Sequence, residues 1–320
     1  MGARMISQKR RSRFARFLGA AILVGTIASQ AGGMEVKANY LYNLSDFDGI
    51  VPYNYARVYA DNSFGEVYVT HGDRVDIFNN RGMQIYDFLL DYPEVKDLLV
   101  TADGDMLALA SKGVGNEIVR CNYRGEPQGV VTLTGIPPEL AKVNYTTMKY
   151  RNGLIHFAAL AARKLVVTDL NGAFVRGYDL GALLTGGMQK KEFADAIIGG
   201  FDVDVEGNIV VSLPILGLVF RVAPDGSFKQ ISRRGSGPGR FGIPADLAID
   251  RFGNVFVCDK LRSVVLVFDK TGRFISEFGF RGLDPGNLIV PVAITIGDDD
   301  RAYVAQLMAR GVNVYKLDYQ

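Results

Sequence analysis

The feature that most constrains the fold of this 320-residue chain is an internal repeat of about 47 residues. Its clearest copy runs from Gly235 to Phe274, and a shift of 47 residues brings the last segment of the chain onto it. Shifts of 46 and then 54 residues place two further copies upstream, and two fainter copies precede them. In five copies, two turn glycines recur 17–21 residues apart. Such a period predicts one supersecondary unit per copy, stacked against its neighbours.

Each copy has the pattern of four short strands. Runs of β-branched and aromatic residues alternate with Asp-Gly and Asn-Gly turns, which is typical of antiparallel hairpins. The runs are apolar at nearly every position, as in Val264 to Phe268, so neighbouring units should cover both faces. We therefore predict an all-β fold, a six-bladed β-propeller of four-stranded antiparallel blades over residues 32–320. The expected blades are 54–90, 95–133, 143–180, 199–231, 243–279 and 289–320.

The ring must also close, because an open edge would leave backbone groups unpaired. The last copy ends with the chain at Gln320, and an extra strand-like stretch, residues 36–47, precedes the first copy. We expect this stretch to supply the outer strand of the last blade.

The copy at 235–279 resembles NHL repeats. The matching features are its Gly-Pro-Gly-Arg-Phe-Gly-Ile-Pro opening, the Leu-Ala-Ile-Asp inner strand, the Gly-Asn-Val-Phe-Val strand and the Val-Phe-Asp ending. The match is close over 200–320 and fainter, but in register, over 54–175. The Asn-His-Leu stretch that names the family is replaced here by residues 260–264 and, in the last copy, 307–311. The resemblance therefore implies the propeller fold but no polar network at that position.

The N-terminus has the order of a secretory signal peptide. Six basic residues and no acid lie within residues 1–16, an uncharged stretch follows from Phe17 to Ala28, and small residues precede a cleavage site after Ala31. The apolar stretch is shorter than the ~20 residues that span a bilayer. We expect residues 1–31 to direct export to the periplasm or outside, by the general secretory route rather than the twin-arginine route. A retained membrane anchor is the alternative.

Removing residues 1–31 changes the charge of the chain. The remaining chain has 30 Lys and Arg and 34 Asp and Glu, so the mature protein is mildly acidic. An acidic exported protein is a poor nucleic-acid binder. We expect no nucleic-acid partner, no membrane span after cleavage, and a monomer that binds a partner protein.

The cysteines and histidines support no metal or redox site. The repeat places Cys121 in the third strand of the second blade and Cys258 in the second strand of the fifth, in opposed blades. Because the Cα atoms of a disulfide lie within about 7 Å of each other, we predict two buried free thiols. His71 should lie near the surface after a second strand, and His156 should lie in the core. Two separated histidines cannot make a tetrahedral zinc site.

The mouth of the central channel, where the inner strands begin, is the candidate binding site. When the copies are aligned, five polar side chains are expected at this mouth: Arg57, Lys96, Asp97, Tyr145 and Asp246. A metal-dependent hydrolase or lyase of lactonase type would need a carboxylate and Asn cage for a divalent ion. Asp97 and Asp246 have no flanking Asn, so we predict no catalytic residue, no metal ligand and no cofactor. A surface calcium site at Asp298–Asp300 is the alternative to a solvated turn.

An insertion at 181–198 lengthens one repeat interval, and a short helix from Gln189 to Ile197 is expected in it. Insertions in repeat arrays often map to a binding face. The sequence thus favours a non-enzymatic propeller that acts as a binding scaffold in the cell envelope. The metal-dependent hydrolase or lyase with its site at the channel mouth is the alternative.

Overall fold

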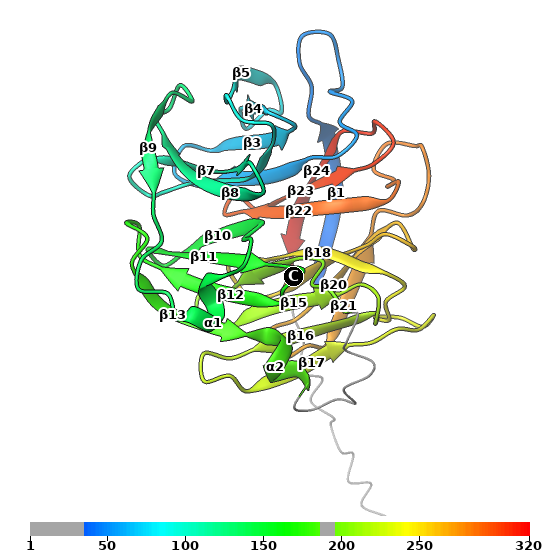
Figure 1. The fold of residues 1–320 in the computed structure, drawn as a ribbon. Helices are drawn as coiled ribbons and strands as arrows, with labels where there is room; N and C mark the ends of the chain where they lie inside the picture. The colour runs from blue at the N-terminus through cyan, green and yellow to red at the C-terminus, as the bar shows by residue number, and fades with distance from the viewer. Residues whose placement is uncertain (1–34, 186–195) are drawn as a thin grey trace, which may run out of the picture. The chain divides into compact units, whose positions relative to one another are not determined.

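The computed structural model describes residues 35–185 and 196–320 (Figure 1). The chain divides into two units, 1–33 and 34–320, and only the second is described below. The predicted signal peptide lies outside the described residues, as does most of the helix predicted at 189–197. Short helices α1 (Pro138–Ala141) and α2 (Leu180–Thr185) occur in loops. Among the described residues, no helix has the length and apolar character needed to cross a bilayer.

The described chain folds into six four-stranded antiparallel sheets, which confirms the predicted six-bladed propeller. Blade 1 holds β2 (Arg57–Asp61), β3 (Glu66–His71), β4 (Arg74–Phe78) and β5 (Gln84–Leu89), and blade 2 holds β6 (Val95–Val100), β7 (Met106–Lys112), β8 (Gly115–Cys121) and β9 (Pro127–Val131). Blade 3 holds β10 (Thr147–Arg151), β11 (Leu154–Ala159), β12 (Lys164–Thr168) and β13 (Phe174–Asp179), and blade 4 holds β14 (Phe201–Val203), β15 (Ile209–Leu213), β16 (Leu218–Val222) and β17 (Phe228–Ser232). Blade 5 holds β18 (Pro244–Ile249), β19 (Val255–Asp259), β20 (Val264–Phe268) and β21 (Phe274–Phe278).

Blade 6 closes the ring with both ends of unit 34–320. Its strands are β22 (Pro291–Gly297), β23 (Arg301–Gln306), β24 (Val312–Tyr319) and β1 (Val36–Asn43). Strand β1 pairs with β24 from Val36 opposite Tyr319 to Asn43 opposite Asn313. The inner strands contact one another in the order β2, β6, β10, β14, β18, β22, and β22 returns to β2. The first strand therefore completes the last sheet, as predicted.

The core consists of six apolar clusters, each lying between two neighbouring blades. Strands β18, β19 and β20 are buried at every position, because adjacent blades cover both of their faces. Outer strands such as β9 are largely exposed. Cys121 and Cys258 are buried in different clusters and are free thiols, which confirms that prediction.

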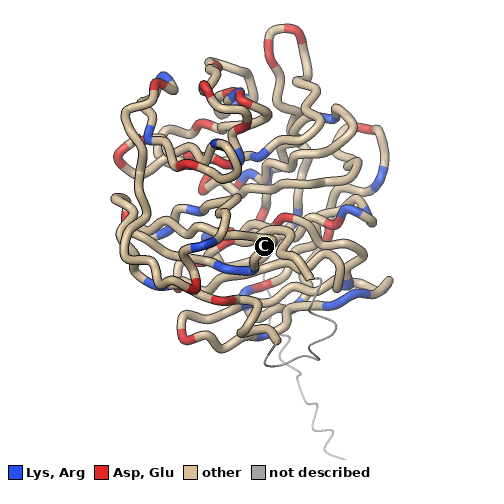
Figure 2. The backbone as a smooth tube through the Cα atoms, in the orientation of Figure 1, with Lys and Arg blue, Asp and Glu red and all other residues tan. Residues whose placement is uncertain are grey.

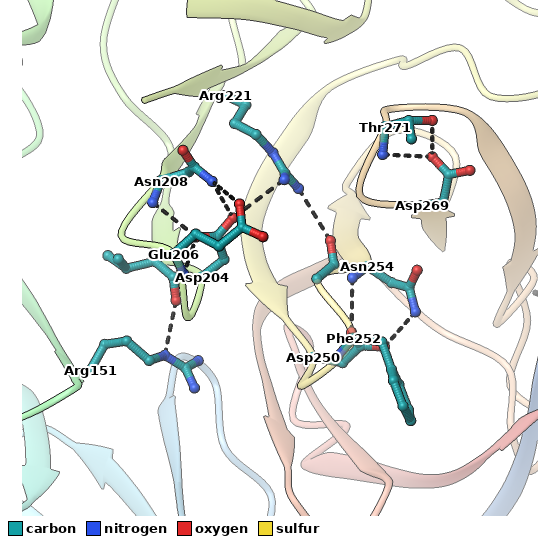
Figure 3. A network of polar contacts seen from close by, with 12 residues as sticks. Arg151, Asp204, Glu206, Asn208, Arg221, Asp250, Phe252, Asn254, Asp269 and Thr271 are labelled. Carbon is teal, nitrogen blue, oxygen red and sulfur yellow. Dashed lines mark hydrogen bonds and ion pairs between the residues drawn. The ribbon is translucent and has the colours of Figure 1, made fainter. Parts of the chain in front are cut away.

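The recurring turns are held by an acidic or amide side chain at the first position. Asp250 accepts hydrogen bonds from the backbone amides of Phe252 and Asn254, and the Asn254 side chain donates to its other oxygen (Figure 3). Gly253 has a φ of +83° in this turn, which a side chain would strain. The local geometry of an Asp–x–x–Gly–Asn sequence thus explains why a glycine recurs in these turns.

Candidate functional site

Three aspartates of the inner strands join three pairs of neighbouring blades. Asp97 of blade 2 accepts a hydrogen bond from the Met148 amide of blade 3 at 2.9 Å. Asp202 of blade 4 accepts one from the Ile249 amide of blade 5 at 2.7 Å. Asp246 of blade 5 accepts one from the Ile294 amide of blade 6 at 3.2 Å.

These three carboxylates are buried. Asp97 and Asp202 also each accept a hydrogen bond from the amide of their own following residue. Hydrogen bonds between a carboxylate and backbone amides are charge-assisted and stronger than neutral ones. The main role of these inner-strand aspartates is therefore to hold neighbouring blades together by hydrogen bonds.

Two cations face the same carboxylates across the ring axis. The Arg57 guanidinium lies 3.7 Å from the Asp246 carboxylate, although the two residues belong to blades 1 and 5. Lys149 of blade 3 is half-buried and interacts electrostatically with all three aspartates. Five of the six inner strands therefore contribute one charge each to a polar cluster at the axis. The inner strand of blade 6, β22, has no charged residue.

Burial and charge pairing compete in this axial cluster. Desolvation raises the pKa of Asp246, and the nearby Lys149 and Arg57 partly offset that rise. Burial works to lower the pKa of Lys149, but the attraction of the carboxylates, first of Asp202, outweighs it and the pKa is raised. The pKa of Arg57 is raised in the same way, chiefly by Asp246. Both cations therefore stay charged at neutral pH.

The five side chains predicted at the channel mouth do not all meet. Arg57, Asp97 and Asp246 belong to the axial cluster, with Asp97 also accepting a hydrogen bond from the Thr147 hydroxyl. Lys96 lies near the mouth and pairs with Glu94. Tyr145 lies apart from these four residues. Its ring is buried between blades 2 and 3, and its hydroxyl donates to the Leu140 carbonyl at 2.7 Å.

Two members of the axial cluster, Lys149 and Asp202, were not found from the sequence. The repeat alignment covers two successive positions per blade, which are Tyr145 and Thr146 in blade 3 and Gly199 and Gly200 in blade 4. The charged side chains of these blades come from positions further along the same strands. A search for charged residues inside otherwise apolar inner strands would have found both.

A pocket of about 270 Å³ opens beside the axial cluster, between blades 1, 2 and 3. It is lined by Tyr55, Arg57, Thr70, His71, Gly72, Glu94, Val95, Lys96, Thr146 and Leu160. His71 is half-buried there, and its Nε2 lies 3.0 Å from the Asp76 carboxylate. Asp76 also accepts hydrogen bonds from Tyr53 and Arg74. His156, the other histidine, is buried in β11, as predicted.

The residues at the axis fit a divalent cation poorly. Arg57 and Lys149 already supply positive charge to these carboxylates, which also accept hydrogen bonds from backbone amides. Across residues 35–185 and 196–320, no group of three or more His, Cys, Asp or Glu side chains could hold a metal ion. In the turn 298–300, Asp299 pairs with Arg301, and Asp300 pairs with Arg251 and Lys316. Cations of the protein thus take the place that a calcium ion would need.

The face at which the inner strands begin, here called the mouth face, carries exposed apolar tips. Because each blade is an antiparallel meander, the loop into its inner strand and the turn between its second and third strands lie at this same face. Nine large apolar side chains on these segments are more than half exposed. Besides Phe47, Tyr55 and Val114, six of them lie in the segments of blades 4 to 6 and in the loop after β1: Ile50, Ile215, Leu261, Phe280, Leu283 and Met308. We call these six residues the apolar crescent.

Arginines hold the crescent segments together. Arg234 donates to the Ile215 carbonyl at 2.6 Å, and Arg281 donates to the Leu261 carbonyl at 2.6 Å. Arg310 donates to the Leu283 carbonyl at 2.9 Å. A pocket of about 290 Å³, lined in part by Ile50, Leu283 and Arg310, connects the loop after β1 to this row. These contacts link neighbouring segments of the crescent in blades 4, 5 and 6.

The opposite face, here called the turn face, holds the network of Figure 3. Arg221 of blade 4 lies 3.3 Å from the Asp204 carboxylate and donates to the Gly253 carbonyl of blade 5. Arg151 of blade 3 donates to the Val203 carbonyl of blade 4. Both arginines donate hydrogen bonds to the next blade, so this network is a second set of contacts that hold neighbouring blades together.

No protein-family model matches the chain, and no curated protein matches its sequence. Solved structures match its fold. A protein of unknown function from Bacteroides thetaiotaomicron is 12% identical with a TM-score of 0.62, covering 89% of this chain and 76% of that one. Virginiamycin B lyase from Staphylococcus aureus is 13% identical with a TM-score of 0.55, covering 89% and 99%. At such identities the similarity establishes the fold alone.

Proposed function

We propose that this chain is an exported, non-enzymatic propeller that binds a partner protein in the cell envelope through its mouth face. The order of residues 1–31 supports export. The resemblance of residues 235–279 to NHL repeats supports a scaffold built from repeats that present one face to a partner.

The apolar crescent is the observation that carries this proposal. Soluble monomers rarely gather large exposed apolar side chains on one face, and such patches mark interaction sites. Leu283 and Met308 are exposed by 72% and 73%, although the arginines beside them fix their loops. Ordered loops with exposed apolar tips lose little conformational entropy on binding. They therefore suit a protein interface better than a small-molecule site.

Site-specific photocrosslinking in the native host tests this function. A photoreactive residue placed at Leu283 or at Met308 should crosslink to the same identified envelope protein. The matched control is Tyr123, which is 69% exposed in a turn of blade 2 at the turn face. Crosslinks that are absent from both crescent positions, or equally strong from Tyr123, would contradict the proposal.

A lyase or hydrolase acting at the channel mouth is the second candidate. The observation in its favour is the pairing of His71 with Asp76 beside the pocket of about 270 Å³, since such a pair can transfer protons. Similarity of fold to virginiamycin B lyase adds to it. Its metal-dependent form requires stoichiometric calcium or zinc in the purified mature protein, lost in Asp97→Ala. Mass spectrometry of the native protein and elemental analysis measure this directly.

A further inference from the structure

The mouth face of blades 4 to 6 is basic although the mature chain is mildly acidic. Its segments 214–217, 233–243, 260–263, 279–290 and 307–311 hold seven Lys and Arg and one Asp. The turn-face segments of the same blades, 204–208, 223–227, 250–254, 269–273 and 297–301, hold eight Asp and Glu and four Lys and Arg. Figure 2 marks these charges along the backbone, with Lys and Arg on the loops at the right of the view. The loops of the two faces thus differ in the sign of their net charge.

Most of the basic residues of the mouth face have no acidic partner. Among the described residues, Arg262 pairs with Glu277, and none of the other six forms an ion pair. These six are Arg233, Arg234, Arg240, Lys260, Arg281 and Arg310. On the turn face, by contrast, Arg221, Arg251, Arg273 and Arg301 are all paired with Asp.

The unpaired cations are interleaved with the apolar crescent. Arg281 lies between Phe280 and Leu283 in one loop, and Lys260 precedes Leu261 in the next turn. The single hydrogen bond from Arg281 to a carbonyl uses one of its five N–H donors. The rest of its guanidinium is available to an acceptor on a bound molecule, with its position already fixed by that bond.

We infer that the mouth face of blades 4 to 6 binds an acidic segment of a partner protein that also carries apolar side chains. This inference rests on the proposed function and names the chemistry of the partner. Six cations without an ion pair can attract carboxylates of a partner, while Leu261, Leu283 and Met308 offer it apolar contacts. The basic N-terminal stretch of this chain has the wrong charge to occupy the surface.

Synthetic peptides test the inference on the mature protein. The first peptide alternates Glu with Leu and Phe, the second replaces Glu by Lys, and the third replaces Leu and Phe by Ser. Fluorescence anisotropy should show binding of the first peptide at least tenfold tighter than of the other two. Its affinity should fall about tenfold as the ionic strength rises from 0.05 M to 0.3 M, because salt screens exposed charges.

Charge reversal locates the interaction. Arg233→Glu with Lys260→Glu should weaken binding of the first peptide at least tenfold, and these two side chains make no contact that the fold needs. The matched control is Lys270→Glu on the turn face, which should leave the affinity within twofold. Leu283→Ser with Met308→Ser should also weaken binding, but without changing its salt dependence. Equal effects of the mouth-face and turn-face reversals would overturn the inference.

Two results would overturn the inference by assigning the mouth face to a different binding partner. Stronger binding to vesicles containing phosphatidylglycerol than to the acidic peptide would assign the surface to a membrane. Self-association in sedimentation velocity, abolished by Arg233→Glu with Lys260→Glu, would assign it to the acidic turn face of a second copy. A crosslinked envelope protein that contacts the crescent through a basic segment would also overturn this inference while leaving the proposed function intact.

Discussion

The Ile249 amide donates a hydrogen bond of 2.7 Å to the carboxylate of Asp202, which lies in the preceding blade. Loss of this carboxylate leaves a buried amide without an acceptor and removes a negative charge that faces Lys149. We expect Asp202→Ala to lower the free energy of unfolding by about 2–4 kcal/mol. Urea denaturation followed by circular dichroism measures it.

Asp202→Asn should fall between the wild type and Asp202→Ala, because its amide oxygen can still accept one hydrogen bond. The matched control is Asp103→Ala in an exposed turn, with an expected change within about 0.5 kcal/mol. If both Asp202 variants unfold at the wild-type urea concentration, the hydrogen bond between Ile249 and Asp202 contributes nothing to stability.

A second contact between blades 4 and 5 restricts position 200 to glycine. A Cβ atom added to Gly200 would lie 2.7 Å from the Cα atom of Asp246, which is closer than real contacts allow. We expect Gly200→Ala to destabilise the protein by about 1–3 kcal/mol, because backbone rather than a flexible side chain would have to move. Differential scanning calorimetry should show a lower unfolding temperature.

Gly115→Ala is the matched control for that experiment. Gly115 lies in β8 and has open space where its Cβ would be. Its replacement should leave the unfolding temperature within about 2 °C of the wild type. A drop as large as that of Gly200→Ala would show that loss of glycine itself, and not the contact with Asp246, is responsible.

The fold could be predicted from the sequence because turns and strands leave local signals. Asp250 and Gly253 recur in equivalent form in several copies, since each turn must satisfy the same backbone amides. The closing strand could be predicted because the last copy lacks an outer strand. These features follow from short-range chemistry that repeats along the chain.

The axial cluster could be predicted only in part. Arg57 and Asp246 were found, but their pairing joins blades 1 and 5 and depends on the closed ring. Tyr145 was placed at the mouth because it aligns with Arg57 and Lys96, whereas its ring packs between blades. The apolar crescent leaves no sequence signal of its own, because exposed Leu and Met in loops are indistinguishable from buried ones before the fold is known.

Burial of Asp246, which the ion pair with Arg57 offsets only in part, should make stability depend on pH. The folded-state pKa of Asp246 is raised, so the folded protein binds more protons than the unfolded chain between the two pKa values. Stability therefore falls as pH rises through that range, which begins near the ordinary carboxyl pKa of about 3.9. Arg57→Leu removes an offsetting charge, raises the pKa of Asp246 further and extends the range upward.

We expect the loss of unfolding free energy in Arg57→Leu to be larger at pH 7.5 than at pH 4.5, by about 1 kcal/mol or more. Urea denaturation of variant and wild type at both pH values gives the comparison. Arg81→Leu, at an exposed turn position, controls for a general change in net charge. A penalty that is the same at both pH values would show that Asp246 does not depend on Arg57 for its ionisation.

The two cysteines should be inert in the folded protein. Burial raises the pKa of the Cys121 thiol to about 11 and raises that of Cys258 well above its usual range. Because the thiolate is the nucleophile, neither should react with Ellman's reagent at pH 8 until the protein unfolds. Two thiols per chain should then appear in guanidinium chloride, and dithiothreitol should not shift the unfolding midpoint. The absence of any thiol after unfolding would reveal a disulfide between the two cysteines and contradict their placement in separate clusters.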